Sequence, residues 1–193
     1  MKDITKKEME LVLFIFKNPE KEHNANNIAS KINITPMGAL KIMKKLDKQG
    51  ILKAKKIGKA VFYKINFEKN YTEDYLIFLL KREAETATPY VKRWVSELKE
   101  LKNADIITLF GSVLDKESKS NDIDALLVTG QRKFGKLKEE ISKINKINEK
   151  NIHPIYQSIG DIKKNIQKQD KIILGALKGI VVSGHKKLIG VLK

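Results

Sequence analysis

The residue types best suited to chemistry lie between positions 105 and 128. Gly111-Ser112 follow a short apolar run, and Asp122-Ile123-Asp124 open a second apolar run that continues to Val128. Glycine and serine at the end of a strand let backbone N–H groups and a hydroxyl approach phosphate oxygens closely. Two carboxylates at positions i and i+2 of a strand point to the same face. This combination suits phosphoryl transfer, in which a divalent metal must lie beside a bound polyphosphate.

The elements around these residues predict a small mixed sheet with helices. Residues 105–110 and 122–128 are short, apolar and rich in β-branched side chains, as strands are. A helix is expected over residues 133–149, another strand over 151–158, and a C-terminal hairpin from 179–183 and 187–192. Upstream, residues 71–102 have helical spacing, interrupted by Thr88-Pro89, and predict two helices or one kinked helix. The expected fold class is therefore α+β.

The string "GSVLDKESKSNDIDALLV" resembles the nucleotidyltransferase superfamily of the DNA polymerase β type, especially its minimal nucleotidyltransferase domains, whose pattern is "GS…(S)DxDLLV". The resemblance implies that Gly111 and Ser112 contact a nucleoside triphosphate. It also implies that Asp122 and Asp124 bind Mg²⁺ and are catalytic if the domain is active. The family often has Arg-Gly after the Gly-Ser pair, and Lys116 is expected to replace that cation here.

One part of the family's site is missing. Such enzymes use a third carboxylate from a neighbouring strand to complete the metal site, and this carboxylate can also act as a base. The strand expected over residues 151–158 contains no acid; His153 lies on it but is a poor ligand for Mg²⁺, and Asp161 lies beyond it. Enzymatic activity therefore stays open, and the residues favour a site that binds nucleotide without efficient turnover.

The first third of the chain has a different pattern. Thr5–Glu8 forms a capping box for a helix that ends before Asn18-Pro19, and a short second helix covers about residues 25–31. Thr35-Pro36 begins a third helix, which stops at Gly50 and is expected to bury the apolar residues Leu40, Met43 and Leu46. Strands are expected over residues 51–55 and 60–67. Three helices and a β-hairpin are the order of a winged helix-turn-helix domain.

The stretch "NIASKINITPMGALKIMKKLDKQGILKAKKIGKAVFYKI" resembles the second helix, recognition helix and wing of MarR/ArsR-like winged-helix regulators. In such folds the third helix lies in the major groove of double-stranded DNA. The residues expected to meet DNA are on this helix and the wing: Thr35, Met37, Gly38, Lys41, Lys44, Lys45, Lys48, Lys55, Lys56 and Lys59. Lysine lacks a bidentate fork, so most contacts would position the protein on phosphates without reading sequence. A winged helix used for protein–protein contact is the alternative.

The charge supports an anionic partner. The 193 residues include 39 Lys+Arg against 23 Asp+Glu, for a formal net charge of +16, and residues 31–64 hold ten lysines with Asp47 as the one acid. The absence of cysteine excludes a disulfide scaffold, a Cys-based zinc finger, an iron–sulfur cluster and a cysteine nucleophile. No apolar run approaches the roughly 20 residues that span a bilayer, and no signal region is evident. A cytoplasmic protein that binds nucleic acid, not a membrane, is expected.

These observations predict a winged-helix domain over residues 1–68, packing helices over 69–103 and a nucleotidyltransferase-like domain over 104–193. The leading interpretation is a homodimeric, DNA-binding transcriptional regulator whose second domain binds nucleotide and Mg²⁺. The alternative is an active nucleotidyltransferase, similar to those of toxin–antitoxin systems, with an autoregulatory winged helix. A scaffold whose two domains both bind protein is the third interpretation.

Overall fold

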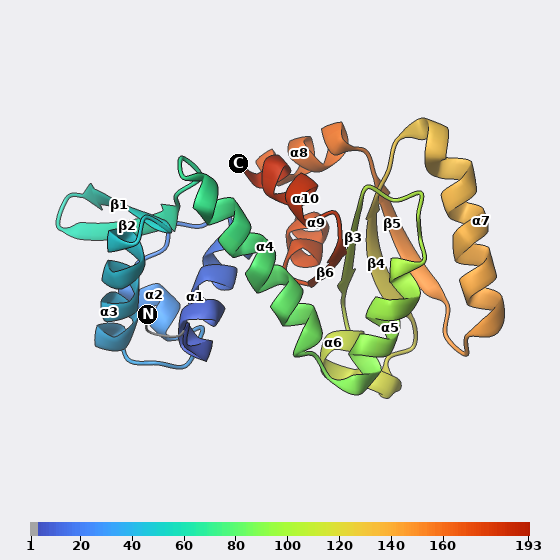
Figure 1. Ribbon diagram of the computed structural model, residues 1–193, viewed down its shortest axis with the longest axis horizontal. Coiled ribbons are helices and arrows are strands. Elements are labelled where there is room, and N and C mark those ends of the chain that lie inside the picture. The colour runs from blue at the N-terminus through green and yellow to red at the C-terminus, as the bar shows by residue number, and fades with distance from the viewer. Residues whose placement is uncertain (1–3) are drawn as a thin grey trace. The chain divides into compact units, whose positions relative to one another are not determined.

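The computed structural model describes residues 4–193, and the chain divides into two compact units, Met1–Leu79 and Leu80–Lys193 (Figure 1). Each unit combines helices with one small sheet, so the fold is of the α+β class that the sequence predicts. The boundary between the units falls inside helix α4 (Asn70–Glu85). The segment 69–103, expected to form a separate set of packing helices, is thus shared between the two units.

The first unit contains three helices followed by a β-hairpin, the order expected of a winged helix-turn-helix. Its elements before α4 are α1 (Lys6–Lys17), α2 (Ala25–Ala29), α3 (Pro36–Lys48), β1 (Leu52–Ile57) and β2 (Ala60–Ile65). The two strands pair antiparallel, with Ile57 opposite Ala60 at the turn. The turn end of the hairpin projects beyond the helices of this unit (Figure 1).

Local signals place the helix starts where the sequence predicts them. The Thr5 hydroxyl accepts a hydrogen bond from the backbone N–H of Glu8, whose side chain in turn accepts one from the N–H of Thr5. Before α3, the Thr35 hydroxyl accepts from the N–H of Gly38 at 3.1 Å, and Pro36 occupies the first turn. Each cap satisfies N–H groups that have no partner within the helix.

The core of the first unit differs at one expected position. Along α3 the buried residues are Ala39, Met43 and Leu46, whereas Leu40, expected to be buried, is only partly covered. Successive residues of a helix differ by about 100° around its axis, so Ala39 shares a face with Met43 and Leu46 at spacings of four and seven. The sequence favoured Leu40 over Ala39 as the buried residue because its side chain is the larger of the two.

His23 ties the hairpin to the end of α1. Its side chain is buried, and its Nε2 donates a hydrogen bond of 2.9 Å to the carbonyl oxygen of Asn18. Its own carbonyl accepts from the N–H of Tyr63 on β2 at 2.7 Å, and its ring meets the edge of Phe14. Burial lowers the pKa of this imidazole below its usual 6.5 and outweighs the hydrogen bond to Asn18, which raises it.

The second unit is built on a four-stranded mixed sheet in the order β5-β4-β3-β6. The strands are β3 (Ile106–Phe110), β4 (Ile123–Val128), β5 (Ile152–Gln157) and β6 (Ile180–Ser183). β4 pairs parallel with β5, whereas β3 pairs antiparallel with both β4 and β6. The helices, including a 3₁₀ turn η1, are α5 (Pro89–Lys99), α6 (Val113–Lys116), η1 (Glu117–Lys119), α7 (Gln131–Ile147), α8 (Ile159–Gln167), α9 (Lys171–Leu177) and α10 (His185–Leu192).

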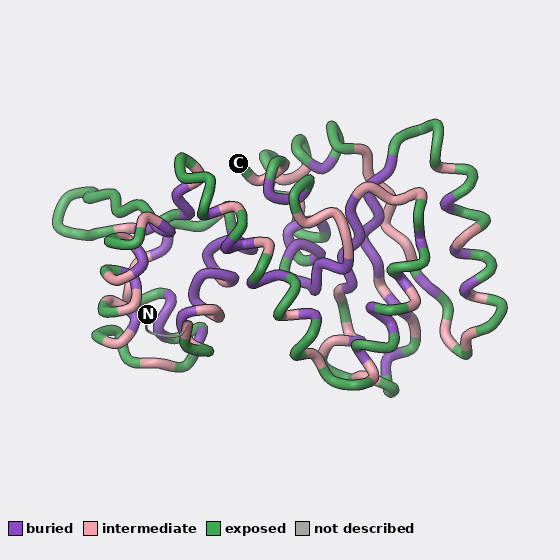
Figure 2. Tube along the Cα trace, in the orientation of Figure 1, coloured by how far each residue is buried: buried purple, intermediate pink, exposed green. Residues whose placement is uncertain are grey.

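Helices cover both faces of this sheet. Trp94 and Leu98 of α5 and Leu137 of α7 belong to one apolar cluster with alternate strand residues such as Leu109 and Ala125. The α8–α10 segment contacts the strands as well, chiefly through α9 and α10 against β3 and α8 against β5. β3, β4 and β6 are accordingly buried along most of their length, whereas β5 at the edge of the sheet is buried only at Ile152 (Figure 2). A strand buried on both faces reads as a continuous apolar run, as residues 125–128 do.

The expected C-terminal hairpin is wrong. Residues 180–183 form β6, but residues 185–192 form α10 and not a returning strand. Gly184 turns the chain with φ +76°, and a Cβ there would lie 2.1 Å from the carbonyl oxygen of Asp105. β6 pairs with the edge of β3, and Leu188 and Ile189 of α10 are both buried. A short apolar run fits either period, and here helix packing decided the outcome.

The membrane prediction can be compared with the helices. Among residues 4–193, none combines the length and the apolar composition needed to cross a bilayer.

The buried His23 predicts that the hairpin loosens in acid. Because the folded state lowers the imidazole pKa, the unfolded chain takes up a proton first as pH falls below about 6.5. Stability is therefore complete above that pH and declines below it. Hydrogen exchange at the Tyr63 amide, corrected for intrinsic rates, should show protection falling from pH 7.5 to pH 5.5.

His23→Gln is the matched variant, since a Gln amide can still donate to Asn18 but does not titrate. We expect its Tyr63 protection to depend less on pH than that of the wild type. Equal pH dependence in the two proteins would contradict the role assigned to His23.

Candidate functional site

The residues expected to bind metal gather where the end of β3 meets the start of β4. Phe110, the last residue of β3, lies opposite Asp124 in the antiparallel pair. Gly111 follows with φ +80°, a backbone conformation that side chains disfavour. A Cβ on Gly111 would lie 2.0 Å from Oδ2 of Asp124, so no larger residue fits. The glycine therefore leaves the space that the Asp124 carboxylate occupies.

His153 completes a three-residue cluster with the two aspartates. Ligand atoms of Asp122, Asp124 and His153 all lie within 4.8 Å of one another, and Nδ1 of His153 is 3.2 Å from Oδ1 of Asp124. The parallel register places His153 directly opposite Asp124 on β5. The Asp124 side chain is 24% exposed and that of His153 is 67% exposed. The strand on which the resemblance implies a third carboxylate thus carries an imidazole opposite Asp124.

From the sequence, His153 is expected on this strand but is a poor ligand for Mg²⁺. What sequence reasoning missed was the pairing register, because parallel neighbours are joined by the long α7 crossover and no local signal fixes their alignment. Once β4 and β5 are aligned, the pairing of Asp124 with His153 follows from one register choice.

The loop before Asp122 is held by Lys150, a residue that the sequence did not suggest. Its ammonium donates hydrogen bonds to the carbonyl oxygens of Ser118 and Ser120, and it lies 5.8 Å from the ring centroid of Tyr90. Ser120 is buried, and its hydroxyl donates to the carbonyl of Glu117 at 2.8 Å. These contacts fix the backbone just before the first aspartate of the cluster.

The remaining residues expected to contact triphosphate flank the cluster. Ser112 is the first residue before α6, and its hydroxyl makes no capping hydrogen bond to that helix. Lys116 is the exposed last residue of α6. Their roles toward a nucleotide stay predictions.

Asp105 is a further acid that the sequence did not assign. Oδ1 of Asp105 accepts from Lys187 at 2.6 Å and from Lys133 at 3.1 Å. The hydrogen bond from Lys187 is the main reason that the pKa of this carboxyl is lowered. Asp105 precedes β3, at the opposite end of that strand from Gly111. It joins α7 and α10 to the sheet and is no part of the metal cluster.

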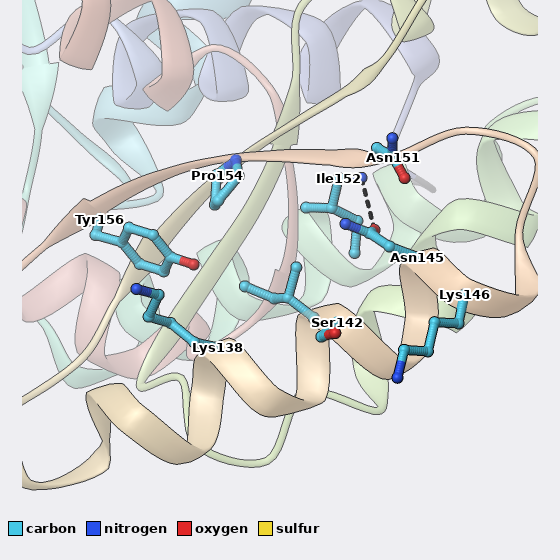
Figure 3. A pocket seen from close by; sticks show the side chains of 9 residues that line it. Lys138, Ser142, Asn145, Lys146, Asn151, Ile152, Pro154 and Tyr156 are labelled. Carbon is cyan, nitrogen blue, oxygen red and sulfur yellow. Dashed lines mark hydrogen bonds between the residues drawn. The ribbon is translucent and has the colours of Figure 1, made fainter.

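A groove of about 500 Å³ lies between α7 and β5 (Figure 3). Lys138 and Ser142 of α7 and Pro154 and Tyr156 of β5 line it. A second hollow of about 420 Å³ adjoins Gly130 and shares Tyr156 with the groove. Pro154 and Tyr156 alternate with His153 along the strand, so the α7 groove opens on the other face of the sheet. Neither hollow includes the aspartate cluster.

In the first unit, six of the expected DNA contacts are exposed lysines: Lys41, Lys44 and Lys48 on α3, and Lys55, Lys56 and Lys59 on the hairpin. Within residues 4–193, none of these six makes an ion pair. Met37 is 73% exposed at the start of α3. Thr35 and Gly38 are joined to each other by the cap hydrogen bond.

Lys45 differs from the other lysines of α3. Its ammonium pairs with the carboxylate of Glu8, whose side chain is only 7% exposed. Burial raises the pKa of Glu8, but hydrogen bonds from Lys45 and Thr5, together with the lysine's charge, lower it overall. The ion pair therefore joins α1 to α3, and Lys45 is less available to DNA than its neighbours.

This pairing predicts different effects for two adjacent lysines. Lys45→Met leaves the nearly buried Glu8 carboxylate unpaired and should lower the free energy of unfolding by about 2 kcal/mol. Lys44→Met removes an exposed charge on the same helix and should change it by less than about 0.5 kcal/mol. Urea denaturation followed by far-UV circular dichroism measures both.

Glu8→Gln supplies the control, because it removes the charge that Lys45 neutralises. We expect the Glu8→Gln/Lys45→Met double variant to lose less stability than the sum of the two single variants. Additive losses would show that the two side chains are not coupled.

Comparison with known proteins gives distant matches only. No protein-family model matches the chain, and no curated protein matches it. Among solved structures, wild-type Lactococcus lactis ZitR in complex with DNA matches at 16% identity with a TM-score of 0.31, covering 51% of this chain and 75% of that chain. Wild-type ZitR alone matches at 16% identity with a TM-score of 0.30, covering 51% and 74%. These values are too low to assign the chain to a family or a function.

Proposed function

We propose that the chain is a DNA-binding transcriptional regulator whose first unit is a winged helix-turn-helix. The observation that carries this proposal is the set of six exposed lysines on α3 and the β1–β2 hairpin that make no ion pair within residues 4–193. In a winged helix these two elements face the DNA, with the helix in the major groove. A concentration of cations on such elements fits the phosphate backbone.

The spacing on α3 supports this orientation. Lys41, Lys44 and Lys48 lie three and seven residues apart and therefore share one face of the helix. The buried stripe of Ala39, Met43 and Leu46 lies on the opposite side. The ammonium groups thus point away from the core that holds the helix in place.

The one acid of the segment, Asp47, joins α3 to the hairpin. Oδ1 of Asp47 accepts a hydrogen bond of 3.1 Å from the N–H of Ala54 at the start of the hairpin. It couples the helix to the wing, so that both present their lysines as one unit. Because lysine reads bases poorly, specificity would come from Thr35, Met37 and Gly38 at the helix N-terminus. A two-fold dimer that engages paired half-sites is the assembly proposed with this function.

Phosphate contacts predict a steep dependence of affinity on salt. The logarithm of the affinity for duplex DNA should fall linearly with the logarithm of salt, with a slope of about −0.9 for each phosphate neutralised. Replacing Lys41, Lys44 and Lys48 together with Gln should reduce the slope by about 2 to 3 units. Fluorescence anisotropy with a labelled duplex at several salt concentrations measures this slope.

A variant that removes three exposed lysines of the second unit, Lys92, Lys143 and Lys163, serves as the charge-matched control. It should keep the slope of the wild type if the winged helix carries the contacts. Equal losses in the two triple variants would indicate binding by net charge alone, and salt-insensitive or absent binding would refute DNA binding.

As a second function, we infer that the unit Leu80–Lys193 binds a nucleoside triphosphate with a divalent cation, as a nucleotidyltransferase-like domain would. The observation that favours it is the convergence of Asp122, Asp124 and His153 beside the Gly111 backbone. The two carboxylates and the imidazole are donors that fit a divalent cation. A bound cation would neutralise phosphate charge there, while Ser112 and backbone N–H groups would contact the phosphate oxygens.

Binding and turnover are separable for this unit. Opposite Asp124 the strand β5 carries His153 and not the third carboxylate that completes the metal site in the resembled family. This favours nucleotide binding that regulates the protein over efficient transfer of a nucleotidyl group. An active nucleotidyltransferase with an autoregulatory winged helix is the alternative.

Labelled ATP with divalent cation distinguishes these functions. We expect binding that Asp122→Asn/Asp124→Asn weakens at least about tenfold, since removing both charges releases the cation. Asp115→Asn, which alters an exposed acid on α6, should leave binding unchanged.

Transfer of label to protein or nucleic acid that the double variant abolishes would establish the enzyme alternative. Binding without transfer would favour the regulatory function. If ATP does not bind in the presence of Mg²⁺, Mn²⁺ or Zn²⁺, neither version stands.

A further inference from the structure

The imidazole in the aspartate cluster changes which cation the site suits. Mg²⁺ prefers an all-oxygen shell of carboxylates, phosphates and water. Imidazole nitrogen is a preferred ligand of first-row transition metals, whose affinity for mixed nitrogen and oxygen donors exceeds that of Mg²⁺. The donor set of Asp122, Asp124 and His153 therefore departs from the magnesium site that the sequence implies.

The geometry of the cluster is compatible with a shared ion. Ligand atoms about 2.1 Å from a metal are about 3.0 Å apart when they occupy neighbouring corners of an octahedron. Oδ1 of Asp124 and Nδ1 of His153 are 3.2 Å apart, and no pair of ligand atoms in the cluster exceeds 4.8 Å. Small side-chain rotations would bring all three onto one ion. Without a metal, the same contact is a hydrogen bond between imidazole and carboxylate.

The backbone holds these donors in place. Asp124 lies between Ile123 and Ala125, both fully buried, and His153 follows the buried Ile152. The N–H of Ile152 donates to Oδ1 of Asn145 on α7 at 2.9 Å, which fixes the start of β5 (Figure 3). Lys150 fixes the loop before Asp122. Donors on paired strands keep their spacing better than donors on a free loop.

The exposure of His153 points to a ligand role. Its side chain is 67% exposed, so it contributes little to the core, yet its Nδ1 points at a carboxylate that Gly111 makes room for.

We propose that Asp122, Asp124 and His153 form a site for a divalent first-row transition metal, such as Mn²⁺ or Zn²⁺, in preference to Mg²⁺. The proposal rests on the cation site proposed above, but it requires neither nucleotide binding nor DNA binding. A nucleotide bound at this site would therefore contact a transition metal instead of Mg²⁺.

The test uses the full chain, stripped of metal with a chelator and without nucleotide. Mn²⁺ binding is followed by the loss of the free-ion signal in electron paramagnetic resonance, and Mg²⁺ is then added as a competitor. We expect Mn²⁺ to bind at least about tenfold more tightly than Mg²⁺. Pulsed electron paramagnetic resonance of bound Mn²⁺ should show coupling to an imidazole nitrogen, a result that needs no variant.

Two substitutions of His153 separate its role from that of the aspartates. His153→Asp creates a three-carboxylate site and should raise Mg²⁺ affinity, so that the preference for Mn²⁺ shrinks. His153→Gln should abolish the nitrogen coupling and weaken Mn²⁺ binding while affecting Mg²⁺ little. Asp115→Asn is the control that should change neither metal.

The outcomes separate the two levels of the proposal. Equal or tighter binding of Mg²⁺, or bound Mn²⁺ without nitrogen coupling, would overturn the preference assigned to His153 and leave the cation site standing. Failure to bind any of Mn²⁺, Zn²⁺ and Mg²⁺ would remove both the preference and the cation site.

Discussion

The close approach between the Gly111 backbone and the Asp124 carboxylate organises the candidate metal site of the second unit. It depends on strand direction. β3 runs antiparallel to β4, so the end of β3 meets the start of β4, and β5 runs parallel to β4, so its start lies at the same edge. Residues following β3, residues opening β4 and the first residues of β5 must therefore converge. The topology would place whatever side chains occupied those positions in one cluster.

Much of this arrangement could be predicted from the sequence because local signals specify it. Thr5 and Thr35 mark helix starts through hydrogen bonds made within one turn. The Gly-Ser pair marks the end of one strand, since glycine allows the backbone conformation needed there. The Asp-x-Asp pair marks the start of the next strand, where alternate residues share a face. Each of these signals spans only a few residues, and for the two threonine caps the physical cause lies within the same turn.

The parts that could not be predicted depend on contacts between distant residues. The pairing of Asp124 with His153 depends on strand register, and the support from Lys150 on a loop about 30 residues away in sequence. Near the C-terminus, only packing against the sheet distinguishes a helix at residues 185–192 from the expected strand. On α3, the choice between Ala39 and Leu40 depends on the rotation of the helix against its neighbours. Composition contains none of this information.

The lysines show why net charge is a poor guide to the binding surface. A net charge of +16 attracts any polyanion from a distance, but salt screens this attraction beyond about 8 to 10 Å. At contact distance, an ammonium group is available to a polyanion only if it does not already bind another group of the protein. Lys45 is bound to Glu8, Lys133 and Lys187 are bound to Asp105, and Lys150 is bound to backbone carbonyls.

These ion pairs and hydrogen bonds divide the lysines into two groups. The bound lysines join elements: α1 to α3 through Lys45, and α7 and α10 to the start of β3 through Asp105. Lys41, Lys44 and Lys48, which make no ion pair within residues 4–193, lie on a helix whose opposite face is buried in the core, so their charges keep a constant spacing. A fixed array can neutralise several phosphates of a regular duplex without first paying the entropy of ordering the chain that carries it. Of the bound lysines, Lys45 contributes to this rigidity in the first unit, because its pair with Glu8 holds α3 against α1.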